Sequence, residues 1–192
     1  MFIVEKYKDF EEKEWDDFVL NDSVNGTFLQ TRRFLNYHPK GRFEDASFII
    51  RDKKGTIAAV CPACEIIESD KKVLYSHKGS TFGGLIIRGK YYNTKKLIEI
   101  IDSTDTFCIE NRYKKVIFKI TPDLFAKESS NLLEYCLEYS NYENYSDLST
   151  FIDYKNYKES IVSNFTQGKR TNVNNCLKKD LKFKQLLSEK EI

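Results

Sequence analysis

The sequence predicts an α+β protein in which helices flank a central and largely antiparallel sheet. Apolar residues recur at helical spacing in some segments and form short runs typical of strands in others. Their order along the chain is strand, two helices, antiparallel strands, helix, strand, helix and strand, which is expected where helices pack on a sheet. With 192 residues, of which 41% are hydrophobic, the chain can bury the core of a domain.

The chain is predicted to open with a short strand and an amphipathic helix. Residues 2–7 (FIVEKY) are the predicted strand, and residues 8–22 the predicted helix, with Trp15 and Phe18 on one face. Asp9 is a residue type that caps helices, and an acidic residue follows three positions later. We therefore expect Asp9 to be the cap of this helix.

A second short helix and a meander of three strands are predicted next. Residues 30–38 carry apolar side chains at helical spacing, and Arg32 and Arg33 are expected to be solvated positions of this helix. Residues 46–77 hold three apolar runs separated by the turn sequences DKKG and ESDKK. Pro62 lies in the middle run. Because proline cannot donate to a sheet ladder, it indicates an edge or a bulge there.

Strands and helices alternate in the next part of the chain. We predict strands over residues 83–89, 114–122 and 144–154, and helices over residues 93–111 and 129–141. The first of these helices begins with Asn93 and Thr94, and either of these residues is expected to be its cap.

Residues 155–192 differ from residues 1–154 in charge. They carry nine lysines and arginines against four acidic residues, whereas the first 154 residues have a net charge of −3. Apolar spacing predicts a helix pair here, with Lys169 and Arg170 directly after Gly168 at a helix start. Amides and cations at one helix start suit an anion, although a solvated helix face gives the same charge count. We expect a domain of residues 1–154 and a basic helical segment of residues 155–192.

The five cysteines are predicted to be reduced, and Cys61 and Cys64 are predicted to be structural. An odd number of scattered cysteines argues against the disulfide framework of a small secreted protein. Cys61 and Cys64 form a CxxC pair, but residues three apart on a strand lie roughly 10 Å apart, beyond disulfide reach. No second such pair completes a zinc site, and we predict no metal site.

The composition predicts a soluble, cytoplasmic protein. Charged residues make up 31% of the chain and the mean hydropathy is −0.53. No apolar stretch approaches the roughly 20 residues of a membrane span. The opening MFIVEKYKDF has no extended apolar region followed by a cleavage site, so we expect no secretion signal.

The stretch SHKGSTFGGLII, residues 76–87, combines residue types used in catalysis with three glycines. Gly79 and Gly84 have the spacing of a phosphate loop, but Gly84 is followed by a predicted strand rather than by lysine, a hydroxyl residue and a helix. Ser76 and His77 are adjacent on an extended chain and point to opposite faces, so they cannot serve each other as nucleophile and base. We expect the glycines to permit a tight turn into a strand.

Several segments resemble the amino-terminal half of the FemAB-like branch of the GNAT acyltransferase superfamily. They are FLQTRRFLNYH, GRFEDASFII, IAAVCPA, SHKGSTFGGLII and KRTNVNNCLKKDLKF, of which SHKGSTFGGLI is the most specific. The resemblance implies a GNAT-like sheet in residues 1–154. It also implies that residues 155–192 begin a second GNAT-like half, so that this chain would be an incomplete enzyme.

The activity implied by the resemblance is acyl or aminoacyl transfer to an amine of a cell-envelope or polysaccharide precursor, as in peptidoglycan synthesis. The acyl donor would be a charged tRNA or an acyl-CoA, with no permanently bound cofactor. Lys169 and Arg170, with Arg42 as a helper, would hold the phosphates of the precursor.

The resemblance leaves the catalytic residues and the oligomeric state open. If the SHKGSTFGGLI stretch touches substrate, His77, Ser80 and Thr81 are expected to line a cleft by hydrogen bonding. A catalytic tyrosine, as found in many GNAT enzymes, cannot be selected among the twelve tyrosines.

Two other functions stay open. One is a self-contained N-acetyltransferase that uses acetyl-CoA, although residues 167–170 (QGKR) hold only pieces of the loop that GNAT enzymes use for that donor. The other is a non-catalytic module that binds nucleic acid or glycan, supported by the basic tail alone.

Overall fold

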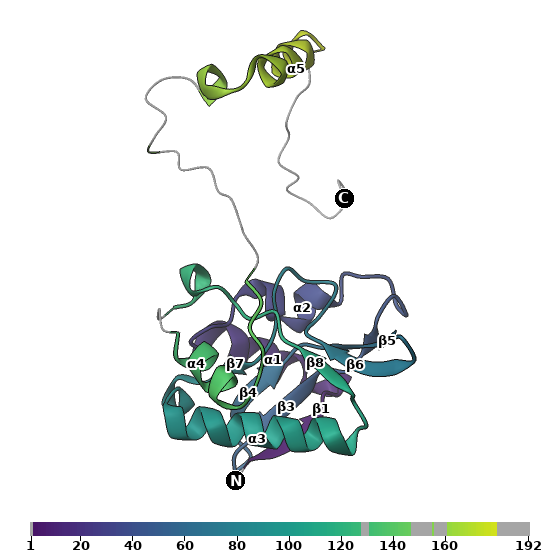
Figure 1. The fold of residues 1–192 in the computed structure, drawn as a ribbon, viewed down its shortest axis with the longest axis vertical. Coiled ribbons are helices and arrows are strands. Elements are labelled where there is room, and N and C mark those ends of the chain that lie inside the picture. Colours follow the sequence, from purple (N-terminus) through teal and green to yellow (C-terminus); the bar gives the residue numbers. More distant parts are fainter. Residues whose placement is uncertain (1, 128–130, 147–154, 156–160, 180–192) are drawn as a thin grey trace. The chain divides into compact units, whose positions relative to one another are not determined.

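The computed structural model describes residues 2–127, 131–146, 155 and 161–179 (Figure 1). The chain divides into two compact units, residues 1–144 and residues 145–192. The division that we expect after residue 154 stays a prediction.

The strands described in the first unit form two four-stranded sheets (Figure 1). The first sheet is antiparallel throughout, in the order β1 (Ile3–Lys6), β3 (Phe48–Arg51), β4 (Ile57–Cys61) and β7 (Ile86–Ile87). The second has the order β2 (Glu44–Asp45), β5 (Cys64–Glu68), β6 (Lys71–Tyr75) and β8 (Lys115–Ile117). Its first two pairs are antiparallel and β6 pairs with β8 in parallel. The predicted largely antiparallel arrangement is confirmed.

The two sheets are connected through one bent hairpin. Ala46 and Ser47 separate β2 from β3, and Pro62 and Ala63 separate β4 from β5. At the bend, the Ala46 N–H donates to the Ala63 carbonyl at 2.9 Å, and the Ser47 hydroxyl accepts from the Ala63 N–H at 3.0 Å. Because Pro62 has no N–H to add to a ladder, the regular pairing is interrupted there. The predicted edge or bulge within one middle strand is therefore wrong in form: the run around Pro62 is divided into β4 and β5, so that the expected three-stranded meander is four strands shared between the two sheets.

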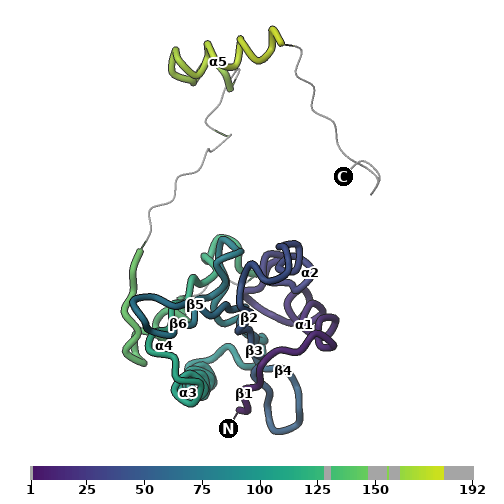
Figure 2. Tube along the Cα trace, turned by 90° about the vertical axis from the view of Figure 1, so that its right-hand side faces the viewer, coloured from purple at the N-terminus to yellow at the C-terminus, as the bar shows by residue number. Residues whose placement is uncertain are grey.

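Helices cover both faces of the first sheet (Figure 2). On β3, Phe48 and Ile50 belong to the same buried cluster as residues of α3 (Thr94–Glu110) and α4 (Leu132–Tyr139). Ile49, between them, packs with Trp15 of α1 (Glu12–Asp17) in a second cluster. Successive side chains of a strand point to opposite faces, which produces two cores and three layers. The predicted α+β class is therefore confirmed.

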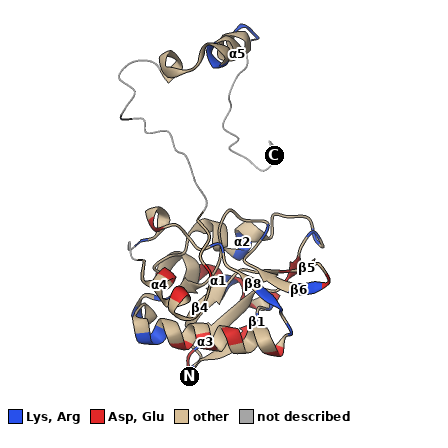
Figure 3. Cartoon of the chain, viewed as in Figure 1, with Lys and Arg blue, Asp and Glu red and all other residues tan. Residues whose placement is uncertain are grey.

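The helix predicted over residues 93–111 is confirmed as α3. Its cap is Asn93, whose side-chain oxygen accepts from the Lys96 N–H at 3.1 Å. Charged residues of both signs occur along this helix (Figure 3). One of its faces is buried by residues at helical spacing, namely Leu97, Ile100, Ile101, Thr104, Phe107 and Cys108.

The helical region near the N-terminus is divided into short pieces. The 3₁₀ turn η1 (Asp9–Glu11) precedes α1, and the π-helical segment η2 (Phe18–Asp22) follows it. The predicted Asp9 cap is wrong. The cap is Lys8, because its N–H donates to the Glu11 carboxylate at 2.9 Å and so starts the turn one residue earlier.

The second predicted helix is shorter than its apolar spacing suggests. A 3₁₀ turn, η3 (Phe28–Gln30), is followed by α2 (Arg32–Leu35). The hydroxyls of Thr27 and Thr31 accept from backbone N–H groups of these two turns. Each threonine therefore begins a new turn, which divides the region that we predict as one helix.

Two further 3₁₀ turns flank the helices of the first unit, η4 (Gly89–Tyr91) and η5 (Asp123–Phe125). In the second unit the structure describes the 3₁₀ turn η7 (Ile161–Asn164) and α5 (Gln167–Lys178). The strand predicted over residues 144–154 lies almost wholly outside the described residues. None of the described helices is long and apolar enough to cross a membrane.

The cysteines are free, and four of them are buried: Cys61, Cys64, Cys108 and Cys136. Burial raises the pKa of Cys61 and Cys64, and it raises that of Cys108 to about 12. A raised pKa keeps a thiol protonated and unreactive at neutral pH. The predicted structural role of the CxxC pair is thus confirmed. Among the described residues, no group of three or more His, Cys, Asp or Glu side chains could hold a metal ion.

Candidate functional site

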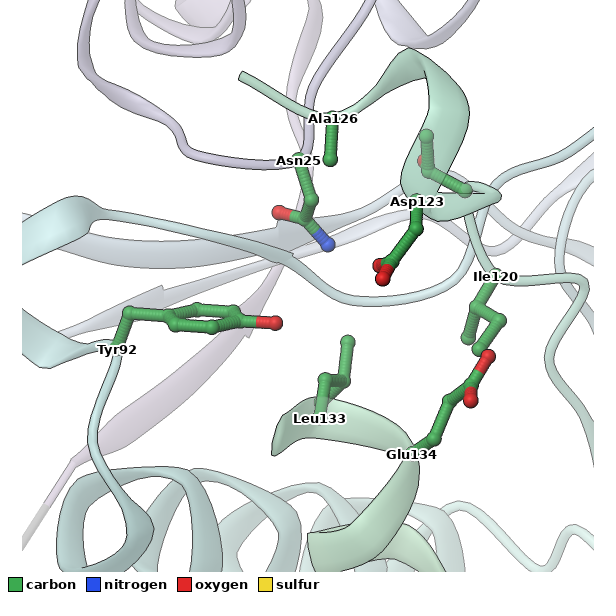
Figure 4. Close-up of a pocket in the computed structure, with 8 residues that line it drawn as sticks. Asn25, Tyr92, Ile120, Asp123, Ala126, Leu133 and Glu134 are labelled. Atoms are coloured by element: carbon green, nitrogen blue, oxygen red, sulfur yellow. The ribbon is translucent and has the colours of Figure 1, made fainter. Parts of the chain in front are cut away.

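A small pocket lies where segments distant in the sequence meet in the first unit (Figure 4). It is bordered by the segment before η3, the segment between η4 and α3, the chain that follows β8, and the start of α4. Its lining residues are Asn25, Tyr92, Ile120, Thr121, Asp123, Ala126, Leu133 and Glu134.

Buried hydrogen bonds fix the walls of this pocket. The Asn25 side chain donates to the Leu85 carbonyl and accepts from the Ile87 N–H, both at 2.8 Å, which ties this wall to β7. The Gln30 amide donates to the Thr121 hydroxyl at 2.9 Å and holds the opposite wall. Since these polar groups are already paired, they shape the pocket rather than offer free partners to a ligand.

Three groups with acid–base capacity face the pocket. The Tyr92 hydroxyl points into it, and the carboxylates of Asp123 and Glu134 lie on the far side (Figure 4). No lysine, arginine or histidine is among the described lining residues. A pocket that offers two carboxylates and a phenol suits a group that arrives as a cation or gives up a proton.

His77 is buried in the turn that follows β6 and does not line the pocket. Its Nδ1 accepts from the Gly79 N–H at 3.1 Å, and its ring contacts Phe43 with centroids 5.3 Å apart. Burial lowers the pKa of His77 to about 4, against the opposing effect of the Asp45 carboxylate. His77 is therefore neutral at pH 7 and serves as an acceptor within the turn.

Gly79 lies between the only two histidines of the chain. The His38 Nε2 lies 2.9 Å from the Gly79 carbonyl, while His77 accepts from the Gly79 N–H. A Cβ at residue 79 would lie 2.3 Å from His38 Nε2 and 2.8 Å from the Phe43 ring. Only glycine fits here. The glycine that resembles part of a phosphate loop is thus required for close packing.

Ser80, Thr81 and Arg42 have different surroundings. The Ser80 hydroxyl donates to the Phe82 carbonyl at 2.9 Å, whereas Thr81 is exposed. Arg42 is also exposed, with its guanidinium 5.5 Å from the Phe43 ring. None of the three is among the pocket lining. Their predicted contacts with substrate stay predictions.

Arg32, which we expect to be solvated, is only 4% exposed, so that prediction is wrong. Its guanidinium pairs with Asp45, donates to the Ser47 hydroxyl at 2.9 Å and lies 4.0 Å from the Tyr7 ring. Burial alone would raise the pKa of Asp45, but Arg32 and Ser47 hold it below its usual value. The pair anchors α2 at the bend of the hairpin, thirteen residues away in sequence, a contact that spacing along one helix could not indicate.

Lys169 and Arg170 lie in the first turn and a half of α5, in the second unit, and both are exposed. The predicted helix start after Gly168 is close to the observed one, since α5 begins at Gln167. Among the described residues, no ion pair holds either cation. Their predicted role in holding phosphate stays a prediction.

The sequence does not predict that Tyr92, Asp123 and Glu134 belong to a site. Tyr92 is one of twelve tyrosines, and the two carboxylates lie on elements predicted as a strand end and a helix. The sequence gives one indication of their role. Each of the three residues lies near the end of a helix or strand, where a side chain need not pack against the core. Their meeting depends on the tertiary structure.

No protein-family model matches the chain, and no curated protein matches it. Several solved structures are similar to it in fold. One is glucosamine-6-phosphate N-acetyltransferase from Arabidopsis thaliana, with 15% identity, a TM-score of 0.44 and coverage of 80% of this chain and 99% of that chain. A second is ribosomal-protein-alanine N-acetyltransferase from Brucella melitensis biovar Abortus, with 8% identity, a TM-score of 0.46 and coverage of 80% and 99%. A third is a GNAT family acetyltransferase of Staphylococcus aureus, with 9% identity, a TM-score of 0.45 and coverage of 79% and 98%.

Proposed function

We propose that this chain contributes to acyl transfer, with the pocket of Tyr92, Asp123 and Glu134 as the place where the accepting amine reacts. One observation carries the proposal, namely that two carboxylates and a phenol hydroxyl surround one pocket that no described cation lines. The acceptor would be an amine of a cell-envelope or polysaccharide precursor, in line with the FemAB-like resemblance of SHKGSTFGGLI.

The chemistry suits these groups. An amine arrives as an ammonium, which carboxylates attract, and it must lose protons before and during its attack on an activated acyl group. A new C–N bond forms while the C–O or C–S bond to the leaving group breaks. Asp123 or Glu134 would accept the proton from the amine, and the Tyr92 hydroxyl would donate a hydrogen bond to the oxyanion or to the departing group.

The proposal also assigns a phosphate-binding role to the exposed cations. Lys169 and Arg170 lie near the N-terminus of α5, where backbone N–H groups and the helix dipole favour an anion. The exposed guanidinium of Arg42, in the first unit, is assigned a phosphate-binding role of its own, since a guanidinium binds a phosphate through two hydrogen bonds. The partner would therefore be a precursor that carries phosphate.

Either a charged tRNA or an acyl-CoA could supply the acyl group. The chain would then act as a FemAB-like half in the first case and as a self-contained N-acetyltransferase in the second. Incubation of the full chain with each donor and a nucleotide-linked peptide precursor, followed by mass spectrometry of the precursor, distinguishes them. Acetylation of the precursor would favour acyl-CoA, and addition of an amino acid would favour charged tRNA.

The pocket is tested by paired substitutions. We expect Asp123→Asn with Glu134→Gln to lower the transfer rate roughly 100-fold, the usual range for loss of a general base. Asp102→Asn with Glu110→Gln changes two exposed carboxylates of α3 and should leave the rate unaltered. Equal rates in the two double variants would remove the pocket from the mechanism.

The phosphate role has a separate readout. We expect Lys169→Ala with Arg170→Ala to weaken binding of the precursor, measured by calorimetry, at least tenfold, since charge-assisted hydrogen bonds are lost. Lys178→Ala, near the far end of the same helix, is the matched control. Unchanged affinity in the double variant would assign the phosphate to other residues.

A further inference from the structure

An apolar edge of the first unit extends from η5 to the loop after α2. We define it by six side chains that are exposed or half-buried, namely Phe28, Phe34, Tyr37, Phe43, Leu124 and Phe125. Four of them are more than half exposed: Phe28 at 62%, Tyr37 at 65%, Leu124 at 83% and Phe125 at 55%. Single exposed apolar side chains are ordinary on a protein surface, but a connected series of them marks an interaction site.

Contacts between aromatic rings connect one side of the apolar edge. The ring centroids of Phe28 and Phe34 are 5.5 Å apart, and those of Phe34 and Tyr37 are 5.3 Å apart. Tyr37 contacts His38 at 4.0 Å, and His38 contacts Phe43 at 5.0 Å. The rings of the η3, α2 and hairpin segments thus form one continuous surface.

The other side of the apolar edge is joined through Ser80. Its hydroxyl lies 3.3 Å from the Leu29 carbonyl, beside Phe28, and 2.9 Å from the Phe82 carbonyl. The Phe82 ring stacks on Phe125, with centroids 5.6 Å apart. Leu124 precedes Phe125 in the exposed turn η5. The exposed side chains of η5 therefore belong to the same edge as those of η3.

Cations surround the apolar edge without acidic partners. Arg33, Lys40, Arg42 and Lys78 are exposed, and none forms an ion pair with a described residue. The sequence carries no acidic residue from position 24 to 43 or from 71 to 98, and the first of these segments supplies four of the six apolar side chains. The carboxylates adjoining the edge in sequence are Glu44, after Phe43, and Asp123, before Leu124. Lysine and arginine are visible on α2 and on an adjoining loop (Figure 3). The charge of the edge is complementary to an anionic partner.

The mixture of side chains favours one class of anion. A single-stranded nucleic acid requires aromatic faces on which bases can stack, but Phe28 and Phe34 meet edge to face at 87°, and the most exposed side chain, Leu124, is aliphatic. Protruding apolar side chains ringed by lysine and arginine instead suit the boundary between acyl chains and negatively charged headgroups.

We propose that the apolar edge docks the protein peripherally on the surface of an anionic lipid bilayer. The apolar side chains enter the headgroup and acyl boundary, while the four cations contact the lipid phosphates. This inference does not rest on the pocket or on acyl transfer, although Arg42 is also assigned to the phosphate of the precursor in the proposed function.

Co-sedimentation of the full chain with vesicles tests the proposal. We expect binding to vesicles of equal parts phosphatidylcholine and phosphatidylglycerol, little binding to phosphatidylcholine alone, and weaker binding as salt is added. Phe28→Ser with Leu124→Ser should lower the partition coefficient at least about tenfold, because two exposed apolar side chains are lost. Lys40→Gln with Arg42→Gln should lower it about fivefold for each cation.

Ile109→Ser with Lys114→Gln is the matched control. Both residues are exposed and lie outside the apolar edge, so vesicle binding should remain within about twofold of the wild type. Thermal unfolding of each variant verifies that the fold is retained. The proposal is overturned if the chain binds neither type of vesicle, or if it binds anionic vesicles with undiminished affinity in both edge variants. It is also overturned if the edge variants lose binding to a single-stranded RNA oligonucleotide while no variant binds vesicles.

Discussion

The polar side chains of the turn of residues 76–84 and those of the pocket beside η5 lie in different surroundings. In the turn, His77 and the Ser80 hydroxyl are engaged by neighbouring backbone groups. In the pocket, the Tyr92 hydroxyl and two carboxylates face a common space (Figure 4). The turn carries residue types that suggest catalysis, whereas the residues of the pocket form no recognisable motif in the sequence.

The comparison shows that the role of a side chain depends on its hydrogen-bond partners as well as on its residue type. A histidine whose nitrogen accepts from the backbone is part of the fold, because leaving that N–H unpaired would cost free energy. A carboxylate on a pocket wall can exchange protons with a ligand. Changes in the turn should therefore alter stability, and changes in the pocket should alter activity.

The largest expected effect concerns the charge of His77. Because its pKa is about 4 in the folded state and near 6.5 when unfolded, the unfolded state binds more protons between these values. The contribution of His77 is thus complete above about pH 6.5 and declines as the pH falls toward 4, by on the order of 3 kcal/mol. Chemical unfolding of the wild type and of His77→Asn at several pH values measures it.

The difference between these two proteins is the relevant quantity, since several carboxylates titrate in the same range. We expect His77→Asn to lose stability less steeply than the wild type below pH 6.5. Parallel curves for the two proteins would mean that the folded state accommodates a charged His77.

The next effect concerns Gly79. A methyl group at this position would overlap the rings of His38 and Phe43, so Gly79→Ala should lower the free energy of unfolding by roughly 2 kcal/mol. Gly89→Ala is the matched control, because its Cβ would meet only Val24 at an ordinary 3.5 Å. Thermal or urea unfolding of both variants decides the matter. Similar losses in the two proteins would exclude the packing explanation.

A smaller effect separates the neighbouring hydroxyls of Ser80 and Thr81. Ser80→Ala removes a hydrogen bond to the Phe82 carbonyl and should cost roughly 1 kcal/mol of unfolding free energy. Thr81→Ala removes an exposed hydroxyl and should change it by less than about 0.5 kcal/mol. The same unfolding measurement applies to both. If Thr81→Ala instead lowers precursor binding without altering stability, its predicted contact with substrate gains direct support.

The smallest effect on stability is expected in the pocket. Glu134→Gln changes a partly exposed carboxylate in the first turn of α4 and should alter the unfolding free energy by no more than about 0.5 kcal/mol. Its effect should appear in the transfer rate. A large loss of stability in Glu134→Gln would make this residue structural and remove the contrast between the two regions.

Local patterns predicted the elements whose causes are local. Apolar spacing and a capping residue at position 93 or 94 predicted α3, whose cap is Asn93. The missing N–H of Pro62 predicted an edge or a bulge at the place where the hairpin bends and the run divides into two strands. The prediction that Asp9 caps the first helix was wrong, because Glu11 competes for the same role through the Lys8 N–H. Sequence spacing alone does not decide between neighbouring caps.

The burial of Arg32 could not be predicted from its helix. An arginine is normally exposed unless it is paired, and its partner Asp45 comes from the start of the hairpin. The pocket could not be predicted for the same reason. Its residues Asn25, Tyr92 and Asp123 come from three separate parts of the chain and meet only in the folded protein.

The sequence by itself therefore determined the class of fold, helix α3 and an irregularity of the strands at Pro62, because periodicity, capping and proline chemistry act between near neighbours. Only the tertiary structure decided which polar side chains are consumed by the fold and which face a pocket or a surface. That outcome depends on contacts between residues far apart in sequence, such as Gly79 with His38 or Gln30 with Thr121. Such contacts exist only once the chain has packed, and no pattern of neighbouring residues encodes them singly.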